Sequence, residues 1–295
     1  MNKILEELIA DAKELARRTL KLVPVATSVD WRQCRAAVWR PEPWGGGLVA
    51  HTDIDDIQLD DLLCIEDQKE QLALNTRQFL AGVPANNVLL WGARGTGKSS
   101  LVHAVLNRYH EAGLRLVEVN KSRLTALPDI VGRLRDEPFM FILFCDDLSF
   151  EADDASFKVL KSALEGSVFK SSGNVLIYAT SNRRHLLPEY MSENEQATFV
   201  EGELHQSEAV EEKISLSDRF GLWLSFYPFK QEAYLDVVQH WLHALAAPHG
   251  VGFSWDDEVR GAALRWALAR GVRSGRTAQH FARHWIGRAA LGHNK

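Results

Sequence analysis

The feature that most constrains this 295-residue chain is a glycine-rich octet between a short apolar run and a helical pattern. The run Val-Leu-Leu-Trp at 88–91 precedes the octet, and apolar residues at helical spacing follow it. Such a strand–loop–helix context is what the pattern GxxxxGK[ST] requires, because glycines let backbone N–H groups surround phosphate oxygens. The helix N-terminus adds a partial positive charge. We therefore expect phosphate binding by Gly92, Ala93, Arg94, Gly95, Thr96, Gly97, Lys98, Ser99 and Ser100.

A phosphate-binding loop of this kind needs a nearby carboxylate that helps to hold a metal ion. Asp146 and Asp147 follow the apolar run 141–145 directly, 48 residues after Lys98. In this interpretation Lys98 reaches the β- and γ-phosphates, while the Ser99 hydroxyl and Asp146 bind Mg²⁺. Asp147 is the candidate general base that polarises the attacking water.

Two other classes of nucleotide-binding protein fit the sequence poorly. A GTPase needs NKxD to recognise guanine, but residues 120–123 read Asn-Lys-Ser-Arg. Small-molecule kinases usually lack a helical domain after the core. Here the ranges 231–245, 256–269 and 277–290 all carry helical patterns.

Apolar runs alternate with helical patterns through the middle of the chain, and this alternation predicts an α/β fold with a five-stranded parallel sheet. The five expected strands are 88–91, 116–119, 139–145, 175–179 and 222–227.

The chain divides into three expected regions. These are an N-terminal helical segment and linker (1–58), a nucleotide-binding core (59–228) and a C-terminal helical lid (229–295). An amphipathic pattern over 4–22 predicts the N-terminal helix, and the prolines and glycines of 41–47 are interpreted as a flexible break. The acidic stretch 53–61 is interpreted as a solvated linker.

Five elements in this order resemble the AAA+ ATPases, beginning with the two segments described above. The run 175–182 resembles the strand that ends in the sensor 1 residue, here Asn182, which the resemblance implies would orient the attacking water. Arg219 matches the arginine finger, which would reach the ATP of a neighbouring subunit. Arg276 matches the sensor 2 arginine of the lid, with Arg273 as the alternative. The resemblance implies ATP and Mg²⁺ as ligands and an AAA+ P-loop fold with a C-terminal helical lid.

A closer resemblance is to a bacterial AAA+ branch, domain-of-unknown-function family 815. Four segments carry it: PANNVLLWG (84–92), CDDLSF (145–150), ATSNRRHLL (179–187) and DRFGL (218–222). The sequence departs from the usual AAA+ pattern by having Asp147 where Glu is common. Glu151 is an alternative base, and Asn120 lies where some members hold a residue that restrains the base.

Charge and composition limit the partners. Basic residues number 34 and acidic residues 39, so the net charge is −5 and the whole chain is not a basic nucleic-acid binder. Residues 259–295, however, contain eight Lys or Arg and no acidic residue, and the insertion 188–212 is rich in Glu. Three widely spaced cysteines and the lack of a long apolar run favour a cytoplasmic protein with no membrane partner.

The sequence therefore predicts an ATPase that uses Mg²⁺ to drive remodelling or loading of an unknown protein client, as a nucleotide-dependent homo-oligomer. Because Asp147 replaces Glu, a weakly hydrolysing, nucleotide-dependent binding or adaptor module is an alternative. A DNA-associated loader that uses the basic C-terminal helices is another, although nucleic acid is not the favoured partner.

Overall fold

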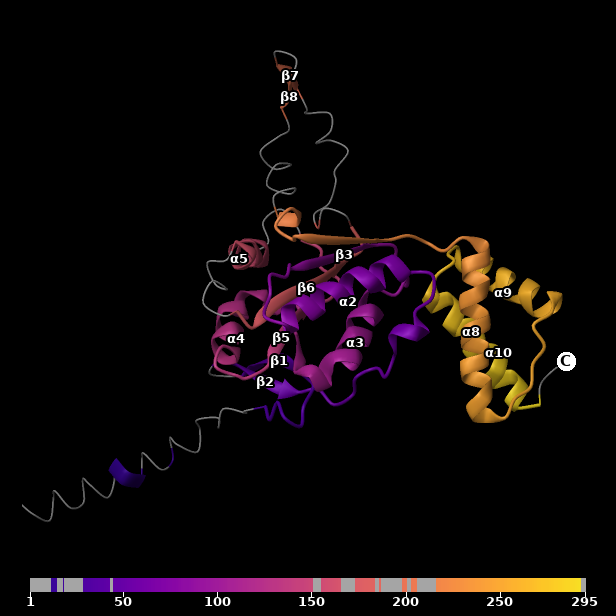
Figure 1. Cartoon of the computed structure of the whole chain (residues 1–295), viewed down its shortest axis with the longest axis horizontal. Helices are drawn as coiled ribbons and strands as arrows, with labels where there is room; N and C mark the ends of the chain where they lie inside the picture. The colour runs from indigo at the N-terminus through magenta and orange to yellow at the C-terminus, as the bar shows by residue number, and fades with distance from the viewer. Residues whose placement is uncertain are drawn as a thin grey trace, which may run out of the picture.

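The computed structural model describes residues 12–14, 18, 29–42, 45–150, 155–165, 173–183, 186, 198–200, 203–205 and 216–292. Most of the helix expected over 4–22 and most of the acidic insertion 188–212 lie outside these residues. Figure 1 shows an α/β unit built around one sheet, with a group of three helices beside it that ends at the C-terminus. None of the helices in the described part of the chain is long and apolar enough to cross a membrane.

One mixed sheet forms the centre of the α/β unit, in the strand order β2-β1-β4-β5-β6-β3-β9. Five neighbouring strands run parallel, as expected: β4 (Leu114–Glu118), β5 (Met140–Cys145), β6 (Val175–Ser181), β3 (Val88–Gly92) and β9 (Leu222–Phe226). The carboxyl ends of β3, β5 and β6 lie at the same edge, because residue 91 pairs with residue 181 and residue 145 with residue 179. Loops that follow these strands therefore meet at one place.

The sheet has seven strands rather than five, and the interpretation of residues 41–47 as a flexible break is wrong. Strands β1 (Ala36–Glu42) and β2 (Gly45–Ala50) form an antiparallel pair that extends the sheet beyond β4. Pro41 is tolerated because β1 pairs with β4 only through residues 36–38, away from the proline. Gly46 is required because a Cβ there would lie 2.3 Å from the buried ring of Trp39.

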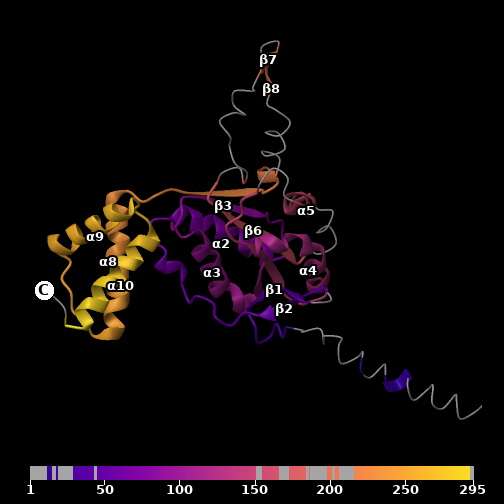
Figure 2. The ribbon, with the colours of Figure 1, turned by 180° about the vertical axis from the view of Figure 1, so that it is seen from behind.

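Helices cover both faces of the sheet, as Figures 1 and 2 show from opposite sides. On β3, Leu89 packs into one apolar cluster, whereas Val88 and Leu90 pack into the other. Helices α4 (Leu127–Leu134) and α5 (Ala155–Leu164) contribute to the first cluster. Helices α2 (Glu66–Leu80) and α3 (Lys98–Tyr109) contribute to the second. Strands buried on both faces explain the continuous apolar runs in the sequence.

The C-terminal helices α8 (Gln231–His249), α9 (Asp257–Arg270) and α10 (Gly275–Ala290) share a separate apolar cluster. Their starts follow from capping side chains, because Asp256 accepts hydrogen bonds from the first turn of α9 and Ser274 accepts one from Thr277 in α10. A short antiparallel pair, β7 (Thr198–Val200) and β8 (Glu203–His205), falls within the acidic insertion. The three helices overlap the ranges expected from the sequence. Helix α8 extends four residues beyond the expected end, and α10 begins two residues before the expected start.

Candidate functional site

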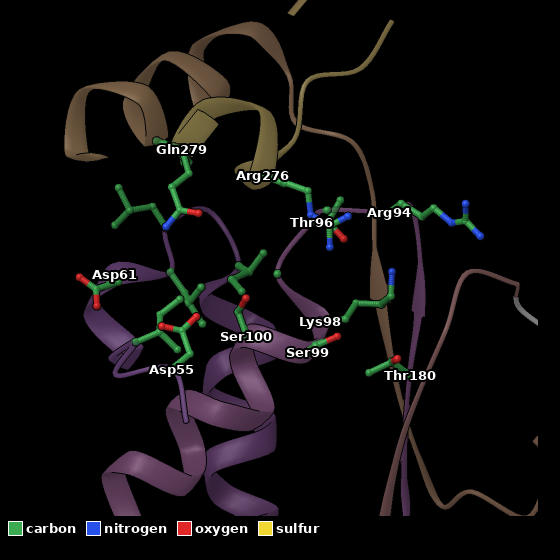
Figure 3. A pocket seen from close by; sticks show the side chains of 18 of the residues that line it. Asp55, Asp61, Arg94, Thr96, Lys98, Ser99, Ser100, Thr180, Arg276 and Gln279 are labelled. Carbon is green, nitrogen blue, oxygen red and sulfur yellow. The ribbon is translucent and has the colours of Figure 1, made fainter. Parts of the chain in front are cut away.

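A cavity of about 440 Å³ lies where the loop after β3 meets the carboxyl ends of β5 and β6 and the lid helices α8 and α10. In Figure 3 the α10 side chains Arg276 and Gln279 lie above it, and Ser99 and Ser100 of α3 lie below. Eleven of the residues predicted for the site line it: Arg94, Gly95, Thr96, Gly97, Lys98, Ser99, Ser100, Asp146, Asp147, Asn182 and Arg276.

Gly92 and Ala93 lie outside the cavity wall and hold the loop in shape. The Gly92 backbone has φ +131°, and a Cβ there would lie 1.9 Å from the Phe226 carbonyl oxygen. The Ala93 N–H donates to the same carbonyl at 3.0 Å, which fixes the loop to β9. Gly97, with φ +100°, caps α3 and brings the N-terminus of that helix to the cavity. The arrangement suits an anionic ligand, because backbone N–H groups at a helix N-terminus attract negative charge.

Lys98 is the buried cation of the site, with 7% of its surface exposed. Its Nζ donates to the carbonyl oxygens of Gly92 and Ala93, both at 2.8 Å, and to Asn182 Oδ1 at 3.3 Å. Burial lowers its pKa to about 8, against the opposing effect of Asp146 and Asp147. A phosphate group in the cavity would provide this amine with the negative charge that its present carbonyl partners lack.

Ser99 and Asp146 form an oxygen-rich pair at the bottom of the cavity. Ser99 Oγ donates to Asp146 Oδ1 at 2.7 Å, and Thr180 Oγ1 donates to the same oxygen at 2.5 Å. No group of three or more His, Cys, Asp or Glu that could hold a metal occurs in the described part of the chain. Mg²⁺ fits this pair nonetheless, because it takes one or two protein oxygen ligands and completes its shell with water and phosphate oxygens.

Asp147 lies beside this pair in a left-handed backbone conformation, with φ +51°. Few residues other than glycine adopt this conformation, and it is concentrated at functional sites. Asn182 Nδ2 donates a short hydrogen bond to Asp147 Oδ1, while Asn182 Oδ1 accepts from Lys98. One amide thus connects the buried cation to the carboxylate that the sequence nominated as general base.

Four other candidates lie away from the cavity or outside the described residues. Arg219 Nε donates to Oε1 of Glu165, the residue that directly follows α5, at 3.0 Å. Asn120 Oδ1 accepts from the Ser122 N–H as a helix cap rather than restraining Asp147. The structure brings Arg276 to the cavity wall and leaves the alternative, Arg273, outside it. Glu151 lies outside the described residues.

The lid touches the phosphate-binding loop directly. The Arg276 N–H donates to the Gly95 carbonyl at 3.1 Å. A Cβ on Gly95 would lie 2.9 Å from Ser274 Oγ and 3.1 Å from the Arg276 Cβ. Gly95 occupies a position of the motif where any residue is allowed, so its φ of +75° and the close approach of the lid together explain why glycine is needed here.

Most aspartates of residues 53–61 are exposed, as expected of a solvated segment, but the segment is more than a linker, because Asp55, Ile57 and Asp61 line the cavity. Ile57 and Leu62 are both 8% exposed, and the carbonyl oxygens of Asp55 and Ile57 accept hydrogen bonds from Asn107 of α3. Asp55 and Asp61 line the cavity from the side, as Figure 3 shows. The apolar residues among the aspartates were the signal that sequence reasoning missed.

Thr180 was also missed, because its role depends on neighbours that lie far away in the sequence. A hydroxyl inside an apolar strand is not by itself a functional signal. The cavity also has apolar lining residues that the sequence did not predict: Ile57, Leu62, Leu63, Ile65, Phe229, Val237 and Trp241.

Comparison with solved structures identifies the fold. The RuvB Holliday junction branch migration motor of Thermotoga maritima aligns with 80% of this chain at 18% identity and a TM-score of 0.52. The Aeropyrum pernix ORC1 protein, solved in complex with DNA, aligns with 73% of it at 18% identity and a TM-score of 0.50. The alignments span 66% of the RuvB chain and 57% of the ORC1 chain, less than two thirds of either.

No curated protein matches the sequence. A family model described as "Protein of unknown function (DUF815)" matches residues 32–289. This match spans the sheet, the cavity and the three lid helices. The chain belongs to the DUF815 family and has the α/β fold of the AAA+ ATPases.

Proposed function

We propose that this protein binds ATP and Mg²⁺, hydrolyses the ATP, and uses the cycle to remodel or load a protein partner. The observation that carries the proposal is the Ser99 hydroxyl, 2.7 Å from the Asp146 carboxylate beneath the phosphate-binding loop. A hydroxyl and a carboxylate, both hard oxygen donors, are the groups that P-loop ATPases use to hold the metal. A cavity of about 440 Å³ also lies within the range of small-molecule sites, roughly 300–1,000 Å³.

Four polar residues of the cavity have separate tasks in this proposal: Lys98, Asp147, Asn182 and Arg276. Lys98 exchanges its carbonyl partners for β- and γ-phosphate oxygens, a stronger, charge-assisted contact. Ser99 and Asp146 would hold Mg²⁺, which would supply positive charge to neutralise the phosphates. Asp147 accepts the proton of the attacking water, which requires that Asn182 release the carboxylate and orient the water instead. Arg276 brings a lid cation to the nucleotide.

We further propose that the protein works as a nucleotide-dependent homo-oligomer. Arg219 lies outside its own cavity, and a guanidinium supplied by a neighbouring copy stabilises the charge of the transferring phosphoryl group. The test mixes Arg219→Ala with Lys98→Ala protein, each inactive alone. Turnover should return in the mixture, because mixed oligomers pair an intact loop with an intact finger. No rescue at concentrations where oligomers form would refute action in trans.

The central test compares ATP binding and turnover of the wild type with those of Lys98→Ala. Wild-type turnover should require Mg²⁺ and should fall to background in the variant. Leu74→Ala supplies a matched control, because this exposed α2 residue lies outside the cavity. Equal turnover in wild type and Lys98→Ala would remove the assignment as an ATPase.

A second candidate function is a nucleotide-dependent binding module that hydrolyses ATP very slowly. The hydrogen bond from Asn182 to Asp147 favours it, because the amide occupies a carboxylate oxygen that a general base would have to present to the attacking water. Tight Mg²⁺-dependent ATP binding with turnover no faster than solvent hydrolysis would support this function. An Asp147→Asn variant held in ATP offers a means of capturing the partner in either case.

A further inference from the structure

Thr180, near the end of β6, links the two carboxylate residues of the candidate site. We infer that Thr180 is a positioning residue, which directs the Asp146 carboxylate toward Ser99 and holds Asp147 in its left-handed conformation. The inference rests on the proposed function and deepens it, because it assigns the arrangement of the acidic pair to one side chain.

The Thr180 hydroxyl makes one hydrogen bond to each of these two residues. It donates to Asp146 Oδ1 at 2.5 Å and accepts from the Asp147 N–H at 2.8 Å. A hydroxyl has one hydrogen to donate, so the direction of the first bond fixes which way the Asp146 carboxylate is turned. The same carboxylate oxygen accepts from Ser99 Oγ, and Thr180 and Ser99 therefore hold it from two sides.

The backbone after β5 depends on the same residue. The Leu148 N–H donates to the Thr180 carbonyl at 2.7 Å, next to the bond between the Asp147 N–H and the Thr180 hydroxyl. Two successive N–H groups are thus satisfied by one residue. The left-handed conformation costs Asp free energy, although less than it costs most residues, and these two bonds help to offset that cost.

Burial makes the side chain effective and also explains why Val cannot replace it. Thr180 is 2% exposed, so water does not compete for its hydroxyl. Val would retain the shape, but it would present a methyl group to a carboxylate oxygen and leave the Asp147 N–H without this acceptor.

The neighbouring residue Ser181 provides a matched control. It is fully buried, and its hydroxyl donates to the Leu148 carbonyl at 2.7 Å. The bond joins the same two segments of chain but does not reach either carboxylate. The same hydroxyl accepts from the Arg183 N–H at 3.1 Å, so its loss reports the structural cost of two hydrogen bonds, neither of which involves a carboxylate.

The experiment compares Thr180→Val, Thr180→Ser and Ser181→Ala with wild type in three measurements. These are ATP affinity in EDTA, the Mg²⁺ concentration that gives half-maximal ATP binding, and kcat with KM. We expect Thr180→Val to bind ATP normally in EDTA. It should need roughly tenfold more Mg²⁺ and lose at least tenfold in kcat, as is typical when a residue supporting a metal ligand is removed. Thr180→Ser should restore both, and Ser181→Ala should resemble wild type.

A role limited to stability would give a different pattern. Wild-type Mg²⁺ dependence and kcat in Thr180→Val would overturn the inference, as would equal losses in Ser181→Ala or no rescue by Thr180→Ser. Thr180→Ala replaces the Val variant if circular dichroism shows that Thr180→Val does not fold. If wild type binds ATP but does not hydrolyse it, the Mg²⁺ dependence of binding alone decides. Wild type that binds no ATP would overturn the proposed function, and the inference with it.

Discussion

Gly95 offers a direct test of the contact between the lid and the phosphate-binding loop. Its backbone has φ +75°, and an added Cβ would lie 2.9 Å from Ser274 Oγ and 3.1 Å from the Arg276 Cβ. Gly95→Ala therefore imposes two costs, a left-handed alanine and a collision with the lid. Gly250→Ala is the matched control, because Gly250 has φ +62° and its Cβ would meet no atom within 4 Å among the described residues.

The two variants are expected to differ by the cost of the collision. A left-handed alanine costs about 1–2 kcal/mol in either variant. Gly95→Ala must also displace Ser274, which is 2% exposed and caps α10, and overpacking of this kind costs about 1–3 kcal/mol. Gly95→Ala should therefore lose about 1–3 kcal/mol more in unfolding free energy than Gly250→Ala. Alternatively, the collision is relieved because the lid moves away from the loop.

Urea unfolding and titration with a fluorescent ATP analogue measure these two outcomes. Release of the lid would appear as weaker nucleotide binding, because Arg276 would move away from the cavity. Gly250→Ala should bind nucleotide as wild type does. If the two variants have the same stability and the same nucleotide affinity, the lid does not rest on the loop in solution and the reasoning fails.

Three further perturbations test other contacts. ATP affinity should fall roughly tenfold per pH unit above about 8, because deprotonation removes the charge of Lys98, whose pKa burial lowers to about 8; constant affinity from pH 7 to 9 would contradict this. Glu165→Gln should raise turnover at low protein concentration by up to about fivefold by weakening one contact that holds Arg219, since exposed ion pairs contribute at most about 1 kcal/mol; unchanged turnover would show that Glu165 does not compete with a neighbouring subunit for Arg219. Gly46→Ala should cost about 1–3 kcal/mol in urea unfolding by colliding with Trp39; wild-type stability would argue against this packing.

Local spacing was enough to predict the parts of the site that adjoin regular elements. The octet that ends in Lys98 and Ser99 lies between a strand and a helix, and Asp146 directly follows a buried strand. Parallel strands bring the residues that follow them to one edge of the sheet, so the sequence alone was enough to expect that these residues lie close together. Arg276 could be favoured over Arg273 because it lies closer to the start of a helix, and only Arg276 lines the cavity.

Other features could not be predicted because they depend on distant partners. The glycines of β2 suggest a loop until Trp39 is seen to need the space above Gly46. The acidic stretch suggests a solvated linker until Asn107 of α3 is found to bind the backbone carbonyls at Asp55 and Ile57. In each case the local composition was typical of a solvated loop, and tertiary contacts fixed the segment against the rest of the fold.

The loop after β3 is attached to the lid by two separate routes. Through the Ala93 N–H it holds the last residue of β9, and only four residues separate that strand from α8. Through the Gly95 carbonyl it holds the first turn of α10. Because the loop has two such attachments, a ligand that changed its backbone conformation would act on the first and the last helix of the lid at the same time. Because the three helices share one apolar cluster, such a change would move them together.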